Sequence, residues 1–224
     1  MEKINIAKII RSKRKTLALE VTQDAGLIVR APELVSSEYI EKIIHKKRFW
    51  IQDRQKDILE KNKKNAPKEY VNGEGFLYLG NTYRLSIEND NLAPLTFDKE
   101  FHLLKNYLPQ ARQVFSDWYK KEAYEKIKQR LDWHSEAAGI RYNKMGITNA
   151  MRRWGSCNTK GNLFFSWRLI MAPLKIIDYV VVHELAHIVV KNHSEKFWIK
   201  IRMIMPDYEY SKNWLKDNEY LLNL

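Results

Sequence analysis

The segment IIDYVVVHELAHIVV, residues 176–190, is the most apolar run of this 224-residue chain. Wound as an α-helix it is apolar on nearly every side, so the sequence predicts a helix buried in a core. Yet His183, Glu184 and His187 lie together in its second half. Ionisable groups in a core are costly unless they are paired or bind a metal. The segment therefore predicts a buried helix that carries a metal site.

The spacing of the two histidines suits a single metal ion. Residues four apart lie on one face of a helix, so His183 and His187 can direct two imidazoles to one point. Zinc accepts neutral imidazole nitrogen at about 2.0–2.1 Å. Glu184 lies about 100° further round the helix, where its carboxylate can reach a water activated by the ion without being a ligand. This is the H-E-x-x-H signature of zinc hydrolases, with Glu184 as catalytic general base.

A catalytic zinc usually has three protein ligands, and His193 is the favoured third candidate. It follows His183 by ten residues, which is the spacing of the longer H-E-x-x-H-x-x-G-x-x-H pattern. That pattern requires the helix to stop and the chain to turn back. Val190 stands where the glycine is usual. Asn192 is expected to make the turn instead, because asparagine tolerates the left-handed backbone conformation.

A carboxylate further along the chain, Asp207 or Glu209, is the alternative third ligand. The expected cofactor is one zinc ion per chain, although imidazole ligands also suit other divalent ions. The remaining histidines are isolated in the sequence and are interpreted as ordinary surface or core residues: His45, His102 and His134.

The order of the expected elements favours an α+β fold. Period-2 patterns and turn residues predict strands over 4–10, 15–22, 26–31, 76–79, 82–87, 140–150 and 162–167. Apolar stripes and capping residues predict a long helix from Ser36 or Ser37 to about residue 62, a second over 109–138, and helices that begin at Pro173, Ser194 and residue 208. We expect a strand-rich N-terminal region with one long helix, residues 1–105, and a metal-binding region, residues 106–224.

Composition limits the classes of partner and location. The chain has one cysteine, Cys157, so it can have no internal disulfide framework. No segment reaches the ~20 apolar residues that span a bilayer, and the first residues lack an apolar signal core. We therefore expect a cytoplasmic protein without membrane contact. The formal net charge of +12 also makes nucleotides or nucleic acid possible partners, and residues 42–68 hold ten Lys or Arg against three acids.

Motifs spread over nearly the whole chain resemble the YgjP-like metallopeptidases, predicted zinc hydrolases related to the SprT-like and WLM peptidases. The N-terminal region carries a weaker part of the resemblance, in Arg11, Arg14, Pro32 and Trp50. Its stronger part is Trp154-Gly155-Ser156-Cys157, Leu169, Pro173, Tyr179 to His187, Asn192-His193-Ser194, Phe197-Trp198 and Pro206.

The resemblance implies three metal ligands, His183, His187 and His193, with Glu184 as the catalytic acid and base. It also implies a minimal zincin-like core, in which a hairpin precedes the zinc helix. It supports His193 over Asp207 as third ligand. It leaves the substrate open, because some relatives carry a peptidase label and others a nucleotide pyrophosphatase label.

The sequence favours a zinc peptidase that acts on polypeptide. The strand over 162–167 is expected beside the zinc helix, where an extended peptide could pair with its edge. Trp154 to Cys157 could form the rim of the cleft. Candidates for holding the substrate or the oxyanion are Arg153, Trp154, Arg168, Tyr208 and Tyr210. Two rival functions stay open: a zinc-dependent nucleotide (UTP-type) pyrophosphatase and a DNA-associated SprT-like protease.

Overall fold

The chain folds as two compact units, residues Met1–Ala66 and Pro67–Leu224. A computed structural model describes residues 4, 6–22, 24–64, 67–90 and 92–224. The division lies well before the boundary near residue 105 that the sequence predicted. The reason is that the hairpin after residue 74 packs on the long helix that follows it. The ring of Phe76 stacks on that of Phe115, with centroids 4.2 Å apart.

The N-terminal unit is built on a three-stranded sheet, with the strand order β1-β3-β2. Its strands are β1 (Ile6–Ser12), β2 (Ala18–Val21) and β3 (Leu27–Pro32). They agree with the strands predicted over 4–10, 15–22 and 26–31, of which residue 5 lies outside the described part. The central strand β3 is parallel to β1 and antiparallel to β2. Leu27, Val29 and Ala31 alternate along it and are buried.

Two helices, rather than the predicted single one, cover this sheet. They are α1 (Ser37–Lys46) and α2 (Arg48–Lys64), with Lys47 between them outside helical geometry (φ −102°, ψ 10°). Ser36 caps α1, since its hydroxyl accepts a hydrogen bond from the Tyr39 N–H at 3.2 Å. Ile40, Ile44 and Ile51 complete the unit's own apolar core.

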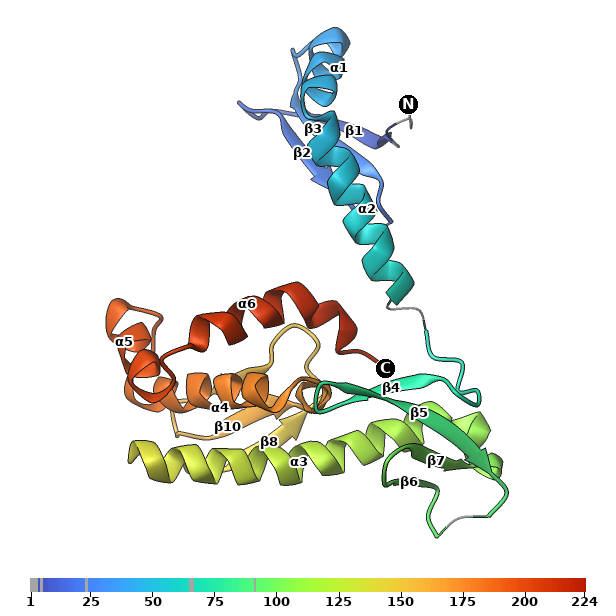
Figure 1. The fold of residues 1–224 in the computed structure, drawn as a ribbon. Helices are drawn as coiled ribbons and strands as arrows, with labels where there is room; N and C mark the ends of the chain where they lie inside the picture. Colours follow the sequence, from blue (N-terminus) through green and yellow to red (C-terminus); the bar gives the residue numbers. More distant parts are fainter. Residues whose placement is uncertain (1–3, 5, 23, 65–66, 91) are drawn as a thin grey trace. The chain divides into compact units, whose positions relative to one another are not determined.

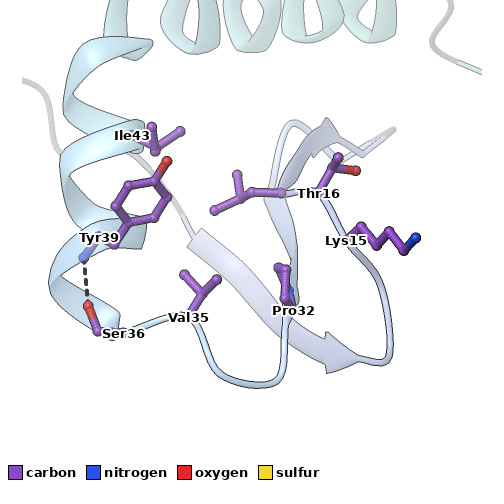
Figure 2. Close-up of a pocket in the computed structure, with 8 residues that line it drawn as sticks. Lys15, Thr16, Pro32, Val35, Ser36, Tyr39 and Ile43 are labelled. Carbon is purple, nitrogen blue, oxygen red and sulfur yellow. Dashed lines mark hydrogen bonds between the residues drawn. The ribbon is translucent and has the colours of Figure 1, made fainter.

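A cavity of about 570 Å³ opens between α1 and the strands of the N-terminal unit (Figure 2). Apolar groups form much of its wall, including Pro32, Val35 and Ile43. Lys15 and Thr16 line it from the chain between β1 and β2.

The larger unit begins with a four-stranded sheet in the order β4-β5-β7-β6. Its strands are β4 (Gly75–Tyr78), β5 (Asn81–Glu88), β6 (Leu95–Phe97) and β7 (Phe101–Leu104). The first two agree with the strands predicted over 76–79 and 82–87, and they pair as an antiparallel hairpin. The last two lie where the sequence suggested no strands. A 3₁₀ helix, η1 (Lys105–Gln110), leads from this sheet to the next helix.

The helix α3 (Ala111–Ala138) agrees with the long helix predicted over 109–138. Its buried side follows a strict four-residue spacing, from Phe115 through Tyr119, Ala123 and Ile127 to Leu131. Gly139 ends the helix in the left-handed conformation, with φ 63°. The helix thereby supplies a long apolar face against which the other elements of this unit pack.

A second sheet of three strands has the order β8-β10-β9. Its strands are β8 (Met145–Thr148), β9 (Gly155–Cys157) and β10 (Leu163–Ser166). The strand predicted over 162–167 is therefore the central one, paired on both sides, and it offers no free edge to a peptide. The free edge beside the metal-site helix belongs to β9, in a segment that the sequence suggested was a loop.

After β10 comes a 3₁₀ helix, η2 (Trp167–Met171), and then the apolar helix α4 (Leu174–Val189), which contacts α3 (Figure 1). The chain ends with α5 (Glu195–Ile204), α6 (Tyr208–Asn218) and the short η3 (Glu219–Leu221). Among the described residues, no helix has both the length and the apolar character that a membrane span needs.

Candidate metal centre

The helix α4 places His183 and His187 one turn apart near its C-terminal end. Pro173 stands at its N-terminus, where a missing N–H costs nothing. Ten of its sixteen residues are buried, as the apolar sequence predicted. The two imidazole rings lie with centroids 4.9 Å apart.

The chain leaves α4 through Val190, whose backbone is extended (φ −124°, ψ 107°) while its N–H still donates to the Ala186 carbonyl. Extended backbone suits a β-branched residue, so no glycine is needed here. Asn192 is not among the residues with positive φ, and the expected left-handed turn at this position is wrong. Its side-chain oxygen instead accepts from the Ser194 N–H at 3.3 Å, which braces the return of the chain.

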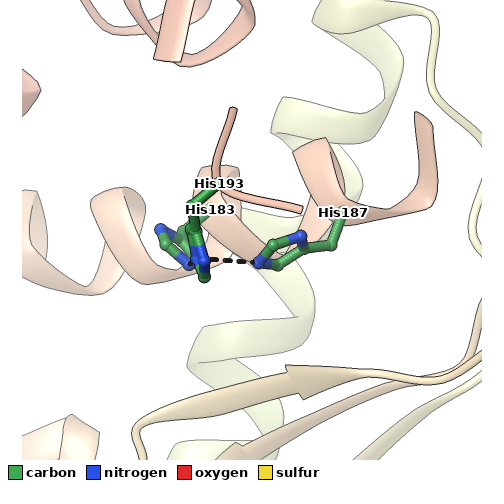
Figure 3. Close-up of side chains that lie close together, drawn as sticks. All are labelled: His183, His187 and His193. Atoms are coloured by element: carbon green, nitrogen blue, oxygen red, sulfur yellow. Dashed lines mark hydrogen bonds between the residues drawn. The ribbon is translucent and has the colours of Figure 1, made fainter. Parts of the chain in front are cut away.

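After the chain turns back, the side chain of His193 lies beside those of His183 and His187 (Figure 3). Its Nε2 lies 3.1 Å from His183 Nε2 and 3.2 Å from His187 Nε2. Two ligands of a tetrahedral zinc ion, each 2.0–2.1 Å from the metal, lie about 3.3 Å apart. The spacing of the three nitrogens therefore fits a metal ion between them. Among the described residues, these three histidines are the group of potential metal ligands whose ligand atoms all lie within 4.8 Å of one another.

The protonation of the imidazoles also suits a metal ion. The Val190 carbonyl can only accept, so His187 Nδ1–H donates to it at 3.1 Å and the Nε2 lone pair stays free. Burial, with the neighbouring His187 and His193, lowers the pKa of His183 to about 3. Burial also lowers the pKa of His187. Neutral imidazole is the form that binds metal.

Aromatic rings hold the three imidazoles in place. Phe197 of α5 is fully buried and lies 4.4–4.9 Å, between ring centroids, from all three histidines. Trp198 stacks on His193, with centroids 5.8 Å apart. Because these rings come from the helix that directly follows His193, α5 fixes both the third imidazole and the wall behind it. Ser194 precedes α5 but its side chain makes no capping hydrogen bond.

Glu184 lies under the strand β9 and is 5% exposed. Gly155 is so close that a Cβ atom built on it would lie 2.5 Å from Glu184 Cγ and 2.6 Å from Oε1. Burial raises the pKa of Glu184 to about 7, and the charge of Arg153 acts in the opposite direction. The carboxylate is thus confined, desolvated and ready to exchange a proton near neutral pH.

The other predicted contact residues are spread over several places. Arg153 is exposed and near enough for its charge to act on Glu184, and Trp154 is half-buried directly before β9. Arg168 stacks on Trp167, 4.4 Å from its ring centroid, in a separate pocket. Tyr208 is buried in a stack with Trp198 and Tyr179, whereas Tyr210 is exposed beside Lys175.

The alternative ligands and the remaining histidines have other partners. Asp207 pairs with Lys175, and Glu209 accepts a hydrogen bond from the Tyr208 hydroxyl. Each isolated histidine also has a partner elsewhere. His45 lies against Arg48, and His134 lies against Asp178. His102 lies between Glu88 and Asp98.

Gly155 is the residue of this site whose positioning role the sequence analysis missed. A glycine inside a short strand often marks the close approach of another group, and this signal was present in Trp154-Gly155-Ser156-Cys157. The signal gives no partner, however, because β9 reaches Glu184 only through the packing of the sheet on α4.

The chain was compared with protein families, curated proteins and solved structures. A family model described as "YgjP-like, metallopeptidase domain" matches residues 15–218. No curated protein matches the chain. Among solved structures, the chain is similar to the metallopeptidase zymogen of Pyrococcus abyssi abylysin. The two are 17% identical, the match covers 40% of this chain and 90% of that one, and the TM-score is 0.37.

Proposed function

Because the chain belongs to the YgjP-like metallopeptidase family, we propose that it is a zinc-dependent peptidase whose ion is held by His183, His187 and His193. The observation that carries this proposal is the convergence of three imidazole Nε2 atoms beside the buried Glu184. The Nε2 of His193 lies 3.1 Å from that of His183 and 3.2 Å from that of His187. Three protein ligands that leave one position open are the usual set of a catalytic zinc. One ion per chain satisfies this set.

Held by these three histidines, a divalent ion would supply Lewis-acid chemistry, which is the activation of a water and the polarisation of the scissile carbonyl. The histidines orient it, and the Val190 carbonyl fixes the tautomer of His187. Imidazole ligands suit several divalent ions, so metal analysis has to identify zinc.

Glu184 is the proposed general base. A pKa near 7 lets its carboxylate take a proton from the attacking water and pass it to the leaving amine. Gly155 leaves the space that this side chain needs, which keeps the carboxylate in one position. Arg153 is the predicted contact residue whose charge reaches this carboxylate, and we retain it as a candidate for holding the substrate.

The free edge of β9 supports an extended polypeptide as substrate. Two backbone hydrogen bonds at the ends of β9 show which of its groups face β10. The Ser166 N–H donates to the Trp154 carbonyl, and the Asn158 N–H donates to the Asn162 carbonyl. In an antiparallel pair the bonding direction alternates, so the N–H and C=O groups of Gly155 and Cys157 point away from β10. A peptide strand could pair with them, which places its backbone next to Glu184.

The test measures zinc content and the cleavage of a casein-derived peptide by the purified chain. Wild type and Glu184→Gln should each hold about one zinc per chain, and Glu184→Gln should lose at least about a hundredfold in kcat because the base is gone. His193→Ala should lose most of its zinc. His45→Ala, an equal change at an exposed histidine of the other unit, should alter neither quantity. Methylating the backbone nitrogens of the peptide should raise KM.

Each rival function predicts a different result. Hydrolysis of UTP without peptide cleavage would make the chain a pyrophosphatase, and cleavage only in the presence of DNA would favour the DNA-associated protease. If wild type neither contains nor takes up zinc, the metal assignment fails. If His193→Ala binds zinc normally, the third ligand lies elsewhere. A cytoplasmic location stays part of the proposal, supported by the single cysteine.

A further inference from the structure

A second cavity of the larger unit, about 550 Å³ in volume, lies apart from the histidines in the residues that line it. Its wall comes from the segment 109–116 at the start of α3, from Asn149 after β8, from Trp167 and Arg168 of η2, and from Leu224. Two of the lining side chains are guanidinium groups, those of Arg112 and Arg168, and none is a carboxylate. We call it the arginine pocket.

Arg168 is fixed at the wall of this pocket. Its guanidinium lies 4.4 Å from the ring centroid of Trp167, and its Nη1 donates to the Asn149 carbonyl at 3.2 Å. Asn149 is itself held, since its side-chain oxygen accepts from the Trp167 indole N–H at 2.8 Å. The planar cation therefore has a defined position before any ligand arrives, and preorganisation of this kind favours binding.

Within the described residues, the positive charge of the arginine pocket forms no ion pair, either with a side chain or with the C-terminal carboxylate of Leu224, which also lines the pocket. The Nε of Arg168 is buried and has no hydrogen-bond partner within that same part of the chain. Burial, and the charge of Arg112 nearby, lower the pKa of Arg168. Two like charges held at one cavity are unfavourable unless an anion joins them.

The N-terminus of α3 adds to this field. The helix has 28 residues, and its N-cap Gln110 makes no side-chain capping hydrogen bond. Its first turn contains no acidic residue, and Arg112 lies within it. The Ala111 N–H already donates to the Leu108 carbonyl of η1. The positive end of the helix dipole still favours an anion, and it makes a cation in the first turn unfavourable without one.

We propose that the arginine pocket binds an oxyanion, a carboxylate or a phosphate group, between Arg112 and Arg168. Guanidinium groups present paired N–H donors that match the oxygens of either group. The amide and hydroxyl groups of Gln113 and Ser116 line the same cavity and can hydrogen-bond to the rest of the ligand.

Calorimetric titration of the 224-residue chain tests this site with three probes: inorganic phosphate, N-acetylglycine and the uncharged N-acetylglycinamide. Wild type should bind phosphate or N-acetylglycine saturably and should not bind the amide. Arg112→Gln and Arg168→Gln should each weaken binding by about tenfold or more, because each removes a charge-assisted hydrogen bond. Arg141→Gln, the same charge change at another exposed arginine of this unit, should leave the affinity unchanged.

The stronger of the two anionic probes identifies the group that the pocket accepts. Absence of saturable binding by both anions overturns the proposal, and so does an equal loss in Arg141→Gln. Arg112 is exposed, so Arg112→Gln should fold even if Arg168→Gln does not. His193→Ala should bind the anion as wild type does. This separates the arginine pocket from the metal centre, so either assignment can fail without the other.

Discussion

His187 shows how one backbone carbonyl decides the chemistry of a side chain. The Val190 carbonyl accepts the Nδ1 proton, so the Nε2 lone pair faces His193 and His183. The position of that carbonyl depends on the extended backbone with which α4 ends. A helix that continued past this residue would remove both the acceptor and the return of His193.

Gly155 makes the sharpest prediction for a single residue. Gly155→Ala would place a methyl group within 2.5–2.7 Å of the Glu184 side chain, which then has to move. We expect kcat for peptide cleavage to fall by about tenfold or more, because displacement of a catalytic group by about 1 Å is costly. Zinc content should stay near one per chain. Metal analysis and steady-state kinetics on the same preparation measure both.

Gly146→Ala is the matched control, because its methyl group would meet the ring of Phe164 at 2.9 Å rather than Glu184. It should lower the free energy of unfolding and leave kcat of the folded fraction unchanged. Equal kcat values for Gly155→Ala and wild type would show that the glycine does not position Glu184.

The three histidines and Glu184 could be anticipated from the sequence because helix geometry fixes which residues share a face. The interval from His183 to His193 added the third. Contacts that depend on tertiary packing could not be anticipated in this way. Gly155 meets Glu184, and Phe197 meets all three imidazoles, only once β9 and α5 are in place.

Between elements, a partly buried ion pair joins α3 to the helix α4. Arg130 donates two hydrogen bonds to the carboxylate of Asp178, at 2.5 and 2.9 Å, and His134 Nε2 lies 3.2 Å from it. The Asp178 side chain is 13% exposed. Burial acts to raise the pKa of Asp178, and the hydrogen bonds from His134 and Arg130 outweigh it, so the pKa lies below its ordinary 3.8.

Asp178→Asn should destabilise the larger unit by about 2–3 kcal/mol at pH 7, because it leaves the Arg130 guanidinium, whose side chain is 22% exposed, without its counter-charge. A carboxylate whose pKa is lowered on folding stabilises the protein above its unfolded pKa. That contribution is lost as the pH falls through the folded value. The difference between wild type and variant should therefore shrink below about pH 4. Urea denaturation at several pH values measures it.

Asp132→Asn provides the comparison on α3, where Asp132 pairs with Lys128 and its side chain is 51% exposed. Exposed pairs contribute little, so this variant should lose less than about 1 kcal/mol. A similar loss for both variants, or a gap for Asp178→Asn that is constant with pH, would contradict the role given to the partly buried pair.

At this scale the sequence predicted helices better than strand partners. The α3 and α4 helices have strong apolar patterns and clear ends at Gly139 and Pro173. The short strand β9 has no such pattern, and it takes the free edge that the sequence analysis assigned to β10. The apolar pattern continues from α1 into α2 although the helix is interrupted at Lys47, because both helices face one core. The sequence therefore predicted one helix.

For the whole molecule, the two units have separate apolar cores with no shared residue. The three clustered histidines and the arginine pocket both belong to the larger unit. The boundary near residue 105 was expected because most of the predicted strands precede it. The aromatic side chains of β4 and β7 instead complete the core around α3, as Phe76 and Phe101 do with Phe115.

Removal of zinc by a chelator should therefore destabilise one unit and not the other. A ligand that binds only the folded state raises the melting temperature of the unit that binds it. For a unit of this size the rise is roughly 5–10 °C when the free ligand concentration is a hundredfold above Kd. Scanning calorimetry should show one transition that moves on chelation and one that does not. The shift should persist in Glu184→Gln and vanish in His193→Ala. Equal shifts of both transitions would indicate that the units unfold together.

The extended Val190 that ends the metal-site helix has a practical consequence for genome surveys. A search that demands glycine three residues after the second histidine passes over this chain, although its three imidazoles converge. The physical requirement is only that the backbone stops being helical there and that a short polar side chain, here Asn192, steadies the reversal. Search patterns that allow any residue at this position would also retrieve sequences that a required glycine excludes.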